Sequence, residues 1–557
     1  MRLPTVLLII SGLAAAGVCL GQSSLHVWDV FELTMTAQAE MENPYVDGLP
    51  EGGAGLVKVV FTGASGDARG KTLTVQGFWD GGRDWKVRFA PPAAGEWSYK
   101  SVSDDAGLNG VEGTLTCVQW TEAELAENAA RRGFVRVCKA GDRAGRYFEY
   151  ADGTPFLWIG DTWWNWSKRN ITFASFKKLA DDRAAKGFTV GQLFFAGRGW
   201  GRNASMLDRT FDRPDIEHIR HVENYIRYAN SIGMTVWVHG WWNSPNMDRT
   251  IGPEKMRRWW RYMVHRLGAY NVIWVLSGEY NMNNYGSLGV QFWKDLGAMI
   301  DAEDPYDRII GAHPTPPGWE GGDEAPQWST AEVLHDEPWL DYNQSQVGHG
   351  KWRNEMIPFV VADAYGRKPA KPIVVTEPWY EFILDSSPAS DIRFGIWSAI
   401  LSGAAGHSYA GGHVWKAHVP ESPVGSDTWP MEQSFEVNTL DYPGAMSLSF
   451  AAKFLRGIEW WRLEPHPEVV LENPSHFCAA LPGKEYLIYL RYGGVVKVDL
   501  SACDTDAAFK CTWYDLTENK ARKTQTVKGG KTPALHPPED YPARLTYKDW
   551  LVHIVRQ

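Results

Sequence analysis

Between residues 155 and 415, short apolar runs of β-prone residues alternate with longer segments whose apolar positions recur every three or four residues. The short runs have the length of buried strands, and the longer segments have the period of amphipathic helices. Eight apolar runs can be placed: 156–164, 188–197, 235–242, 272–279, 308–314, 340–349, 372–377 and 406–415. Helix-like segments lie between many of them: 171–187, 214–233, 253–270, 290–304, 352–366 and 391–403.

This alternation predicts an α/β fold of the (β/α)8 TIM-barrel class. We take the C-terminal tips of the runs as Asp161, Gly197, Trp242, Glu279, His313, Gln346, Glu377 and His413. Successive tips are then 31 to 45 residues apart, which suits the strand–helix units of such a barrel. The segments do not resemble one another, which argues against a solenoid. We therefore place the barrel at residues 146–462.

The pattern is different on both sides of the barrel. Residues 22–120 hold short alternating segments separated by Gly, Pro and Asp turns, which predicts an N-terminal β-sandwich. Residues 121–145 form a connector with a charged, helical stretch. Residues 463–557 return to short strands and predict a second, smaller β-sandwich. We expect both sandwiches to be accessory, so that a fragment of about residues 130–470 keeps the active centre but loses stability where its contacts with the sandwiches become exposed.

The N-terminus has the pattern of an export signal. Arg2 precedes an apolar run that ends near Cys19, which predicts a signal peptide over residues 1–21 with cleavage near Gly21. Cys19 also leaves a lipoprotein anchor open, although Val18 stands where such a signal has a small residue. No later segment is long and apolar enough for a membrane helix. We expect a secreted or periplasmic protein.

Composition narrows the classes of partner. A net charge of −10 and a pI near 5.9 argue against binding to nucleic acid. The 29 tryptophans either pack in cores or stack on sugar rings. Without Cys19, the cysteines are five, an odd set that is no disulfide framework, although Cys503 and Cys511 could pair. No CxxC or HExxH motif occurs, so neither a zinc finger nor a zincin peptidase is supported.

Two carboxylates stand at tips of the predicted strands. Glu279 ends the fourth run and Glu377 ends the seventh, and the C-terminal tips of barrel strands form the face that carries active sites. Two carboxylates that face each other across the open end of the barrel, its mouth, can cleave a glycosidic bond. Because this reaction needs no metal, we expect no metal and no cofactor. The alternative is that either acid caps a helix or forms a salt bridge. Glu381 is a competing carboxylate, which we expect to hold the substrate or a neighbouring side chain.

Other polar and aromatic residues near the tips are candidates for contact with a sugar. Trp415 is the leading candidate for a sugar platform, with Trp163 and Trp241 behind it. The tip histidines could bind metal, but we expect them to hydrogen-bond sugar hydroxyls, and we expect Trp274 and Tyr280 to raise the pKa of Glu279 by desolvation. The full set of predicted substrate-binding residues is Asp161, Trp163, His239, Trp241, Asn243, Tyr280, His313, Glu381, His413 and Trp415.

Several motifs resemble a known family. The runs DGTPFLWIGDTWW, WVLSGEYN, PIVVTEPWYE and AAGHSYAGGHVWK are similar to those of the apiosidase-like glycoside hydrolases. The leading segment resembles a β-sandwich domain of unknown function that precedes such barrels. The tail resembles the collagen-binding-type domain of collagenase-related proteins. One departure is Ser277-Gly278-Glu279, where apiosidase-like members commonly carry Gly-Gly-Asp.

The resemblance implies a barrel related to the clan A glycosidases. It implies that Glu279 is the acid/base and Glu377 the nucleophile of a retaining mechanism. We expect a secreted glycoside hydrolase whose partner is an oligo- or polysaccharide of plant, algal or microbial origin. The alternatives are a non-catalytic glycan-binding protein that uses the barrel as a scaffold, and a collagen-binding or proteolytic protein, for which the chain shows no peptidase chemistry.

Overall fold

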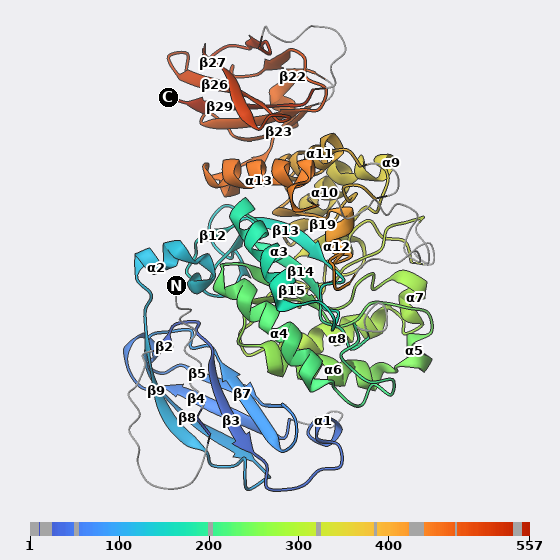
Figure 1. The fold of residues 1–557 in the computed structure, drawn as a ribbon. Helices are drawn as coiled ribbons and strands as arrows, with labels where there is room; N and C mark the ends of the chain where they lie inside the picture. Colours follow the sequence, from blue (N-terminus) through green and yellow to red (C-terminus); the bar gives the residue numbers. More distant parts are fainter. Residues whose placement is uncertain are drawn as a thin grey trace.

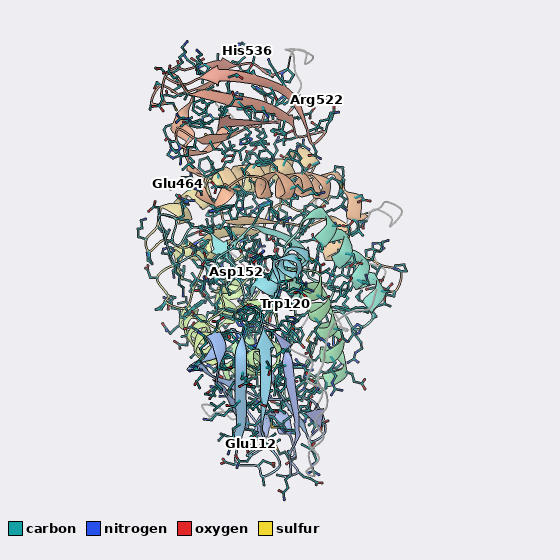
Figure 2. The ribbon with its side chains drawn as sticks, turned by 90° about the vertical axis from the view of Figure 1, so that its left-hand side faces the viewer. Glu112, Trp120, Asp152, Glu464, Arg522 and His536 are labelled. Carbon is teal, nitrogen blue, oxygen red and sulfur yellow. The ribbon has the colours of Figure 1, made fainter. Side chains whose placement is uncertain are left out.

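Three β-rich units follow one another along the chain in the computed structural model (Figure 1). An N-terminal sandwich lies at one end, a barrel in the middle and a C-terminal sandwich at the other end, and Figure 2 shows the same line from Glu112 to His536. Apart from β1 (Ile10–Ser11), the predicted signal peptide lies outside the described residues. The structure describes residues 10–11, 25–49, 55–198, 204–318, 325–383, 387–422, 439–473, 476–538 and 548–557.

The N-terminal unit is the predicted sandwich. One sheet has the order β1-β3-β7-β6 and the other the order β2-β9-β8-β4-β5. Alternate side chains of one strand, Val57, Val59 and Phe61, are fully buried, and Phe61 stacks on Phe89 of the opposite sheet with ring centroids 3.9 Å apart. The strands are β2 (Leu25–His26), β3 (Phe31–Thr36), β4 (Val57–Gly63), β5 (Thr72–Gln76), β6 (Phe78–Trp79), β7 (Asp84–Phe89), β8 (Gly95–Ser103) and β9 (Glu112–Val118).

The connector begins with a helix and leads into a small sheet at the floor of the barrel. Helix α2 (Glu122–Glu127) starts at a capping box formed by Thr121 and Glu124. The small sheet β10 (Arg136–Val137), β11 (Phe148–Glu149) and β12 (Pro155–Phe156) then turns its aromatic side chains toward Trp158. These rings close the amino end of the barrel, so the side opposite the strand tips is filled with apolar side chains.

The barrel contains all eight predicted strands. They are parallel, in the order β17-β16-β15-β14-β13-β20-β19-β18. Asp341 links the two outer strands: its N–H donates to Ile310 O at 3.1 Å, and its Oδ2 accepts from Ile310 N at 2.8 Å. The strands are β13 (Trp158–Trp163), β14 (Val190–Phe194), β15 (Thr235–His239), β16 (Val272–Val275), β17 (Ile310–Gly311), β18 (Asn343–Gln346), β19 (Ile373–Glu377) and β20 (Gly406–Tyr409).

A ring of helices covers the barrel (Figure 1). The six predicted helical segments appear as α3 (Phe173–Lys186), α4 (Ile216–Ser231), α6 (Pro253–Leu267), α8 (Val290–Glu303), α10 (Ile357–Gly366) and α11 (Ala389–Leu401). Helix α13 (Pro443–Arg456) was not predicted. The eighth predicted strand was too long, because the strand ends at Tyr409 and residues Gly412–Trp415 form helix α12. Short helices α5 (Met247–Thr250), α7 (Met282–Gly286) and α9 (Lys351–Asn354) also follow strand tips.

The strands separate two apolar layers, as the two-residue period of a strand requires. On β13, Trp158 points into the barrel, where its ring lies 5.5 Å from that of Tyr342. Its neighbour Ile159 belongs to the outer layer under the helices. This alternation decides which residues near the strand tips can reach the mouth.

The C-terminal unit is the second predicted sandwich, and it rests on α11 and α13 (Figure 1). Its larger sheet has the order β21-β23-β24-β29-β26-β27 and its smaller sheet the order β22-β25-β28. Arg393 of α11 pairs with Asp549 at 2.6 Å, and the described cysteines are free, so Cys503 and Cys511 are not paired. The strands are β21 (Glu464–Pro465), β22 (Val470–Glu472), β23 (His476–Leu481), β24 (Glu485–Leu490), β25 (Val496–Val498), β26 (Ala508–Asp515), β27 (Lys520–Lys528), β28 (Ala534–Leu535) and β29 (Trp550–Arg556).

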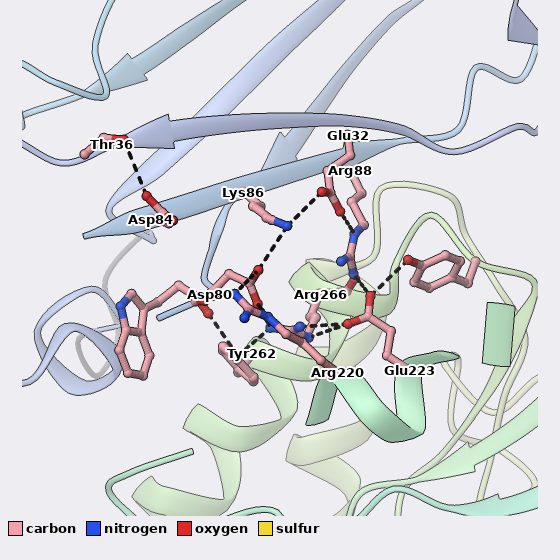
Figure 3. Close-up of polar contacts among 12 residues, drawn as sticks. Glu32, Thr36, Asp80, Asp84, Lys86, Arg88, Arg220, Glu223, Tyr262 and Arg266 are labelled. Atoms are coloured by element: carbon pink, nitrogen blue, oxygen red, sulfur yellow. Dashed lines mark hydrogen bonds and ion pairs between the residues drawn. The ribbon is translucent and has the colours of Figure 1, made fainter. Parts of the chain in front are cut away.

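A buried network of charged side chains joins the N-terminal sandwich to helices α4 and α6 (Figure 3). Arg88 on β7 donates to Glu32 at 2.7 Å and also pairs with Glu223 on α4. Glu223 accepts from Arg266 on α6 at 2.7 Å, and Arg266 pairs with Asp80 of the sandwich at 2.8 Å. All five side chains are at most 5% exposed. The two units therefore share a closed polar interface.

No helix among the described residues is both long and apolar enough to cross a membrane.

Candidate active site

Glu279 stands on a tight turn after β16. Its φ is 48°, in the left-handed region that non-glycine residues rarely adopt, so the surrounding structure must hold it there. Asn243 does so by donating to the carbonyls of Tyr280 and Met282 at 2.8 and 2.5 Å. The preceding residue must be glycine, because a Cβ on Gly278 would lie 2.1 Å from the indole of Trp242. The Ser-Gly-Glu sequence therefore admits a tryptophan beside the acid.

The surroundings of Glu279 keep its carboxyl group protonated. The side chain is 5% exposed, and its Oε1 accepts from Gln346 Nε2 at 3.0 Å and from Thr315 Oγ1 at 3.2 Å. Trp242 also hydrogen-bonds this carboxyl group. Burial first, and then the charge of Glu377, raise its pKa to about 8, and the hydrogen bonds oppose this only in part. Near neutral pH, Glu279 can therefore donate a proton.

The surroundings of Glu377 have the opposite effect. His313 Nε2 lies 2.9 Å from one carboxylate oxygen, and His349 Nε2 lies 3.4 Å from the other. Burial alone would raise the pKa of Glu377, but the hydrogen bonds and charges of the two imidazoles outweigh it and lower the pKa to about 2. Thr376 Oγ1 lies 3.1 Å from the second ring nitrogen of His313 and fixes its orientation. Glu377 is therefore a carboxylate at any ordinary pH.

Aromatic rings surround the two acids. The ring of Trp242 lies 6.1 Å from that of His313 and 5.7 Å from that of Trp164. Trp164 donates to Tyr380 OH at 3.0 Å, and Tyr380 in turn hydrogen-bonds Glu377. These rings exclude water and keep the local dielectric low, which strengthens the effect of each charge on the other.

Some predicted substrate-binding residues lie in this inner layer. His313 contacts Glu377 directly. His239 is fully buried in the aromatic wall, with its ring 5.6 Å from that of Trp242, and burial lowers its pKa to about 3. Trp415 packs on Tyr380 with ring centroids 6.0 Å apart. Asn243 lies behind Glu279 and supports its turn rather than facing the mouth.

The other predicted residues lie in the outer layer or in loop supports. Asp161 accepts from Arg183 and from Trp163, each at 2.8 Å, and Trp163 packs on Phe176 of α3. Trp241 faces Phe211, with ring centroids 6.2 Å apart. Asp161 and Trp163 thus contact α3, and Trp163 and Trp241 both belong to the apolar cluster under the helices. These three side chains are therefore not among the substrate contacts that we propose below.

Glu381, Tyr280 and His413 are also engaged within the fold. Glu381 accepts from Tyr409 OH at 2.7 Å and from the N–H of Gly444 at 2.8 Å, so it holds the start of α13. Tyr280 donates to Gln327 at 2.5 Å in the outer layer, and Trp274 lies in the same layer. His413 Nδ1 lies 2.6 Å from Tyr442 OH. Burial raises the pKa of Glu279, as predicted, although Trp274 and Tyr280 belong to the apolar cluster under the helices.

Sequence reasoning missed several residues of the site. Trp164 and Trp242 each follow directly after the tryptophans chosen from the sequence, Trp163 and Trp241. Since every second side chain of a strand points to the same face, the inward Trp158 would have identified Trp164 as inward as well. Gln346 was predicted only as a strand tip, without a role. His349, in the same predicted run, was expected to hydrogen-bond sugar hydroxyls like the other tip histidines, and not to contact Glu377. Thr315 comes from an irregular loop, for which the sequence offers no periodic signal.

Among the described residues, no group of three or more His, Cys, Asp or Glu side chains could hold a metal ion.

Comparison with known proteins agrees with this architecture. A profile described as the apiosidase-like catalytic domain matches residues 142–462, and a domain of unknown function (DUF5060) matches residues 24–104. No curated protein matches the chain. The resemblance of the tail to a collagen-binding-type domain stays a prediction.

Solved structures share the fold. A candidate glycoside hydrolase from Bacteroides vulgatus ATCC 8482 is 18% identical with a TM-score of 0.69, covering 96% of this chain and 100% of that one. A protein described as a glycoside hydrolase is 19% identical with a TM-score of 0.66, covering 77% and 98%. A glycoside hydrolase family 5 protein from the same Bacteroides strain is 18% identical with a TM-score of 0.65, covering 77% and 94%. Since the profile of the catalytic domain covers more than half of the chain, this protein belongs to the apiosidase-like family.

Proposed function

We propose that this protein is an exported glycoside hydrolase that cleaves O-glycosidic bonds of a plant, algal or microbial glycan with Glu279 and Glu377. The observation that supports this most directly is that the two buried carboxyl groups differ in protonation state near neutral pH. The pKa of one is about 8 and that of the other about 2, which separates an acid from a nucleophile in one site. Export is supported by the sequence of the first 21 residues.

The two acids divide the reaction between them. Glu279 donates its proton to the leaving oxygen while Glu377 attacks the anomeric carbon, which forms a glycosyl ester of inverted configuration. Water then displaces Glu377 with a second inversion, so the net reaction retains the configuration. Ester formation removes the charge of Glu377. The pKa of Glu279 then falls, because that charge is one of its two upward causes. Glu279 becomes a better base at the step in which it takes a proton from the attacking water.

A panel of plant, algal and microbial polysaccharides and aryl glycosides tests this function. We expect the purified full chain to release product from at least one of them, and a Glu279→Ala/Glu377→Ala double variant to release none. Proton NMR of the first-formed anomer checks retention. A protein that binds a glycan of the panel without hydrolysing any would instead be the non-catalytic scaffold.

The pH dependence of kcat/KM should follow the two carboxyl groups. Activity requires ionised Glu377 and protonated Glu279, so we expect a plateau that falls on the alkaline side near the pKa of about 8. The acid-side loss should lie close to the pKa of about 2, where Glu377 becomes protonated, provided that the fold survives. Initial rates measured at subsaturating substrate across the pH range check both limbs.

Gln346 should set the position of the alkaline limb. Its amide stabilises the ionised form of Glu279 by one hydrogen bond, so Gln346→Met should raise the pKa of Glu279 and move the limb up by about one pH unit. Gln344→Met is the matched control on the same strand, because Gln344 donates to Tyr342 and is not among the groups that shift the pKa of either acid. An unchanged limb in Gln346→Met, or an equal shift in both variants, would contradict the assignment.

A further inference from the structure

Trp352 is an exposed tryptophan beside the proposed active site. Its side chain is 58% exposed, whereas many tryptophans of this chain are buried in the cores. Exposure of a large apolar ring carries a free-energy cost. Single exposed apolar side chains are nevertheless common on protein surfaces, so what distinguishes Trp352 is its place beside the two acids. Trp352 lies on the short helix α9, which follows barrel strand β18 at its tip.

The ring of Trp352 is held from behind. The guanidinium carbon of Arg353 lies 4.6 Å from the centroid of Trp352 and 5.9 Å from that of Trp328. Trp328 meets Trp352 edge to face, at 6.1 Å and 90°. Arg353 is 5% exposed and donates to Val347 O at 3.5 Å. One side of the indole therefore has fixed partners, and its exposed surface faces solvent in a set orientation.

The chain ties this ring to both acids. Gln346 donates to Glu279, His349 lies against Glu377, and Trp352 follows His349 after three residues. Three residues span at most about 11 Å, which a short oligosaccharide can bridge. Ser345 of the same strand donates to Trp328 O at 2.9 Å, so the second tryptophan is fixed to β18 as well.

We propose that Trp352, supported by Trp328 and Arg353, is the stacking platform of a distal sugar subsite, so that the substrate is a glycan chain that continues beyond the cleaved bond. This inference rests on the proposed function and narrows its substrate class. Indole rings bind the C–H face of a sugar by apolar burial at little entropy cost, because only two side-chain torsions need to be fixed. A single ring of this size suits one sugar unit better than a protein surface, which buries a much larger area.

Dependence on chain length tests the platform. With the glycan found by the panel, Trp352→Ala should lower kcat/KM by about 10- to 100-fold on oligosaccharides long enough to reach α9. The same variant should change kcat/KM less than about twofold on the aryl monoglycoside of the same sugar. Phe173→Ala is the control: Phe173 is also exposed, at 42%, but lies on α3 next to β13, away from β18. Equal losses at all lengths, or none at any, would overturn the proposal.

A binding experiment separates this inference from the proposed function. Calorimetry measures how tightly Glu279→Gln and the double variant Glu279→Gln/Trp352→Ala bind oligosaccharides of two to six units. The probes are gluco-, xylo-, manno- and pectin-derived oligosaccharides. We expect the added substitution to weaken binding of the longer members by about tenfold or more. If the unaltered protein hydrolyses nothing but this difference persists, the proposed function fails and the platform stands. If Glu279→Gln binds none of these probes, or both variants bind them equally, the platform is wrong.

Discussion

Glu377→Ala is expected to abolish turnover on every glycoside, with a loss of about four orders of magnitude or more in kcat. The reason is that this carboxylate supplies the new covalent bond, and no leaving group, however good, replaces it. The two imidazoles that lower its pKa have no function in catalysis without it. Stopped assays with an aryl glycoside and a natural glycan, at high protein concentration, measure the residual rate.

The loss of turnover in Glu279→Ala should depend on the leaving group of the substrate. Its contribution is a proton for the leaving oxygen, so activated aryl leaving groups need it least. We expect a large loss on the natural glycan and a much smaller loss in the first step on an activated aryl glycoside. External azide should then restore part of the turnover, because it attacks the glycosyl ester without a general base. Rescue of Glu377→Ala under the same conditions, giving the retained product, would contradict the assignment of roles.

Glu381 is the carboxyl group that a reader of the sequence would offer as an alternative nucleophile. In the structure it holds Tyr409 and the start of α13, and burial raises its pKa. Glu381→Ala should therefore reduce stability rather than remove a chemical group. If a folded Glu381→Ala protein were inactive on all substrates while Glu377→Ala kept wild-type turnover, the nucleophile would have to move to Glu381.

The barrel and its two acids could be predicted because both depend on local pattern. Each strand is a continuous apolar run, since parallel barrel strands are buried on both faces, and a carboxylate that directly follows such a run is conspicuous. Glu279 and Glu377 both follow this rule. Helix α13 was missed, although it has Pro443 near its start and Gly457 after its end, because many of its buried positions are Gly, Ala and Ser and its apolar stripe is weak.

The direction of side chains near the tips could be predicted only in part. In a strand, neighbours point to opposite faces, so an error of one position exchanges the mouth for the helix layer. Trp163 was chosen where Trp164 lies at the site, and Trp241 where Trp242 does. The hydrogen bond from Thr315 depends on how an irregular loop folds back. Contacts of this kind are set by tertiary structure and leave no period in the sequence.

The interface between the N-terminal sandwich and the barrel was beyond prediction for the same reason. Its charged residues are far apart along the chain, as Arg88 and Arg266 show. In the sequence, each of them looks like an ordinary charged residue of the surface. The burial of these side chains also bears on what we expect of the fragment of residues 130–470. The sandwich supplies Tyr45 and Phe78 to the core beneath α6, where their rings lie 5.4 and 6.4 Å from that of Tyr262. We therefore expect the fragment of residues 130–470 to be poorly stable, and not an independent catalytic unit.

Glu223→Ala is expected to destabilise the protein by about 3–5 kcal/mol, because it leaves Arg88 and Arg266 buried without their shared carboxylate. Urea denaturation followed by tryptophan fluorescence measures the shift in midpoint. Lys139→Ala is the control and should change nothing measurable, since the pair of Lys139 with Asp307 is 72% and 78% exposed on the two sides. An equal shift in both variants would show that the buried network is no stronger than a surface pair.

The pH dependence and a double variant distinguish a buried ion network from simple packing. Burial raises the pKa of Glu223, but the charges of Arg266 and Arg88 outweigh it and hold the pKa below the usual 4.5. A lowered pKa means that the stabilisation is present above about pH 4.5 and is lost as the pH falls below it. The loss of stability caused by Glu223→Ala should therefore become smaller in acid.

The double variant Arg88→Met/Glu223→Met should lose less stability than the sum of the losses of the two single variants, because the second substitution removes a charge that the first left unpaired. Strict additivity, with a deficit that does not change down to pH 3, would show that apolar packing rather than ion pairing joins the two units.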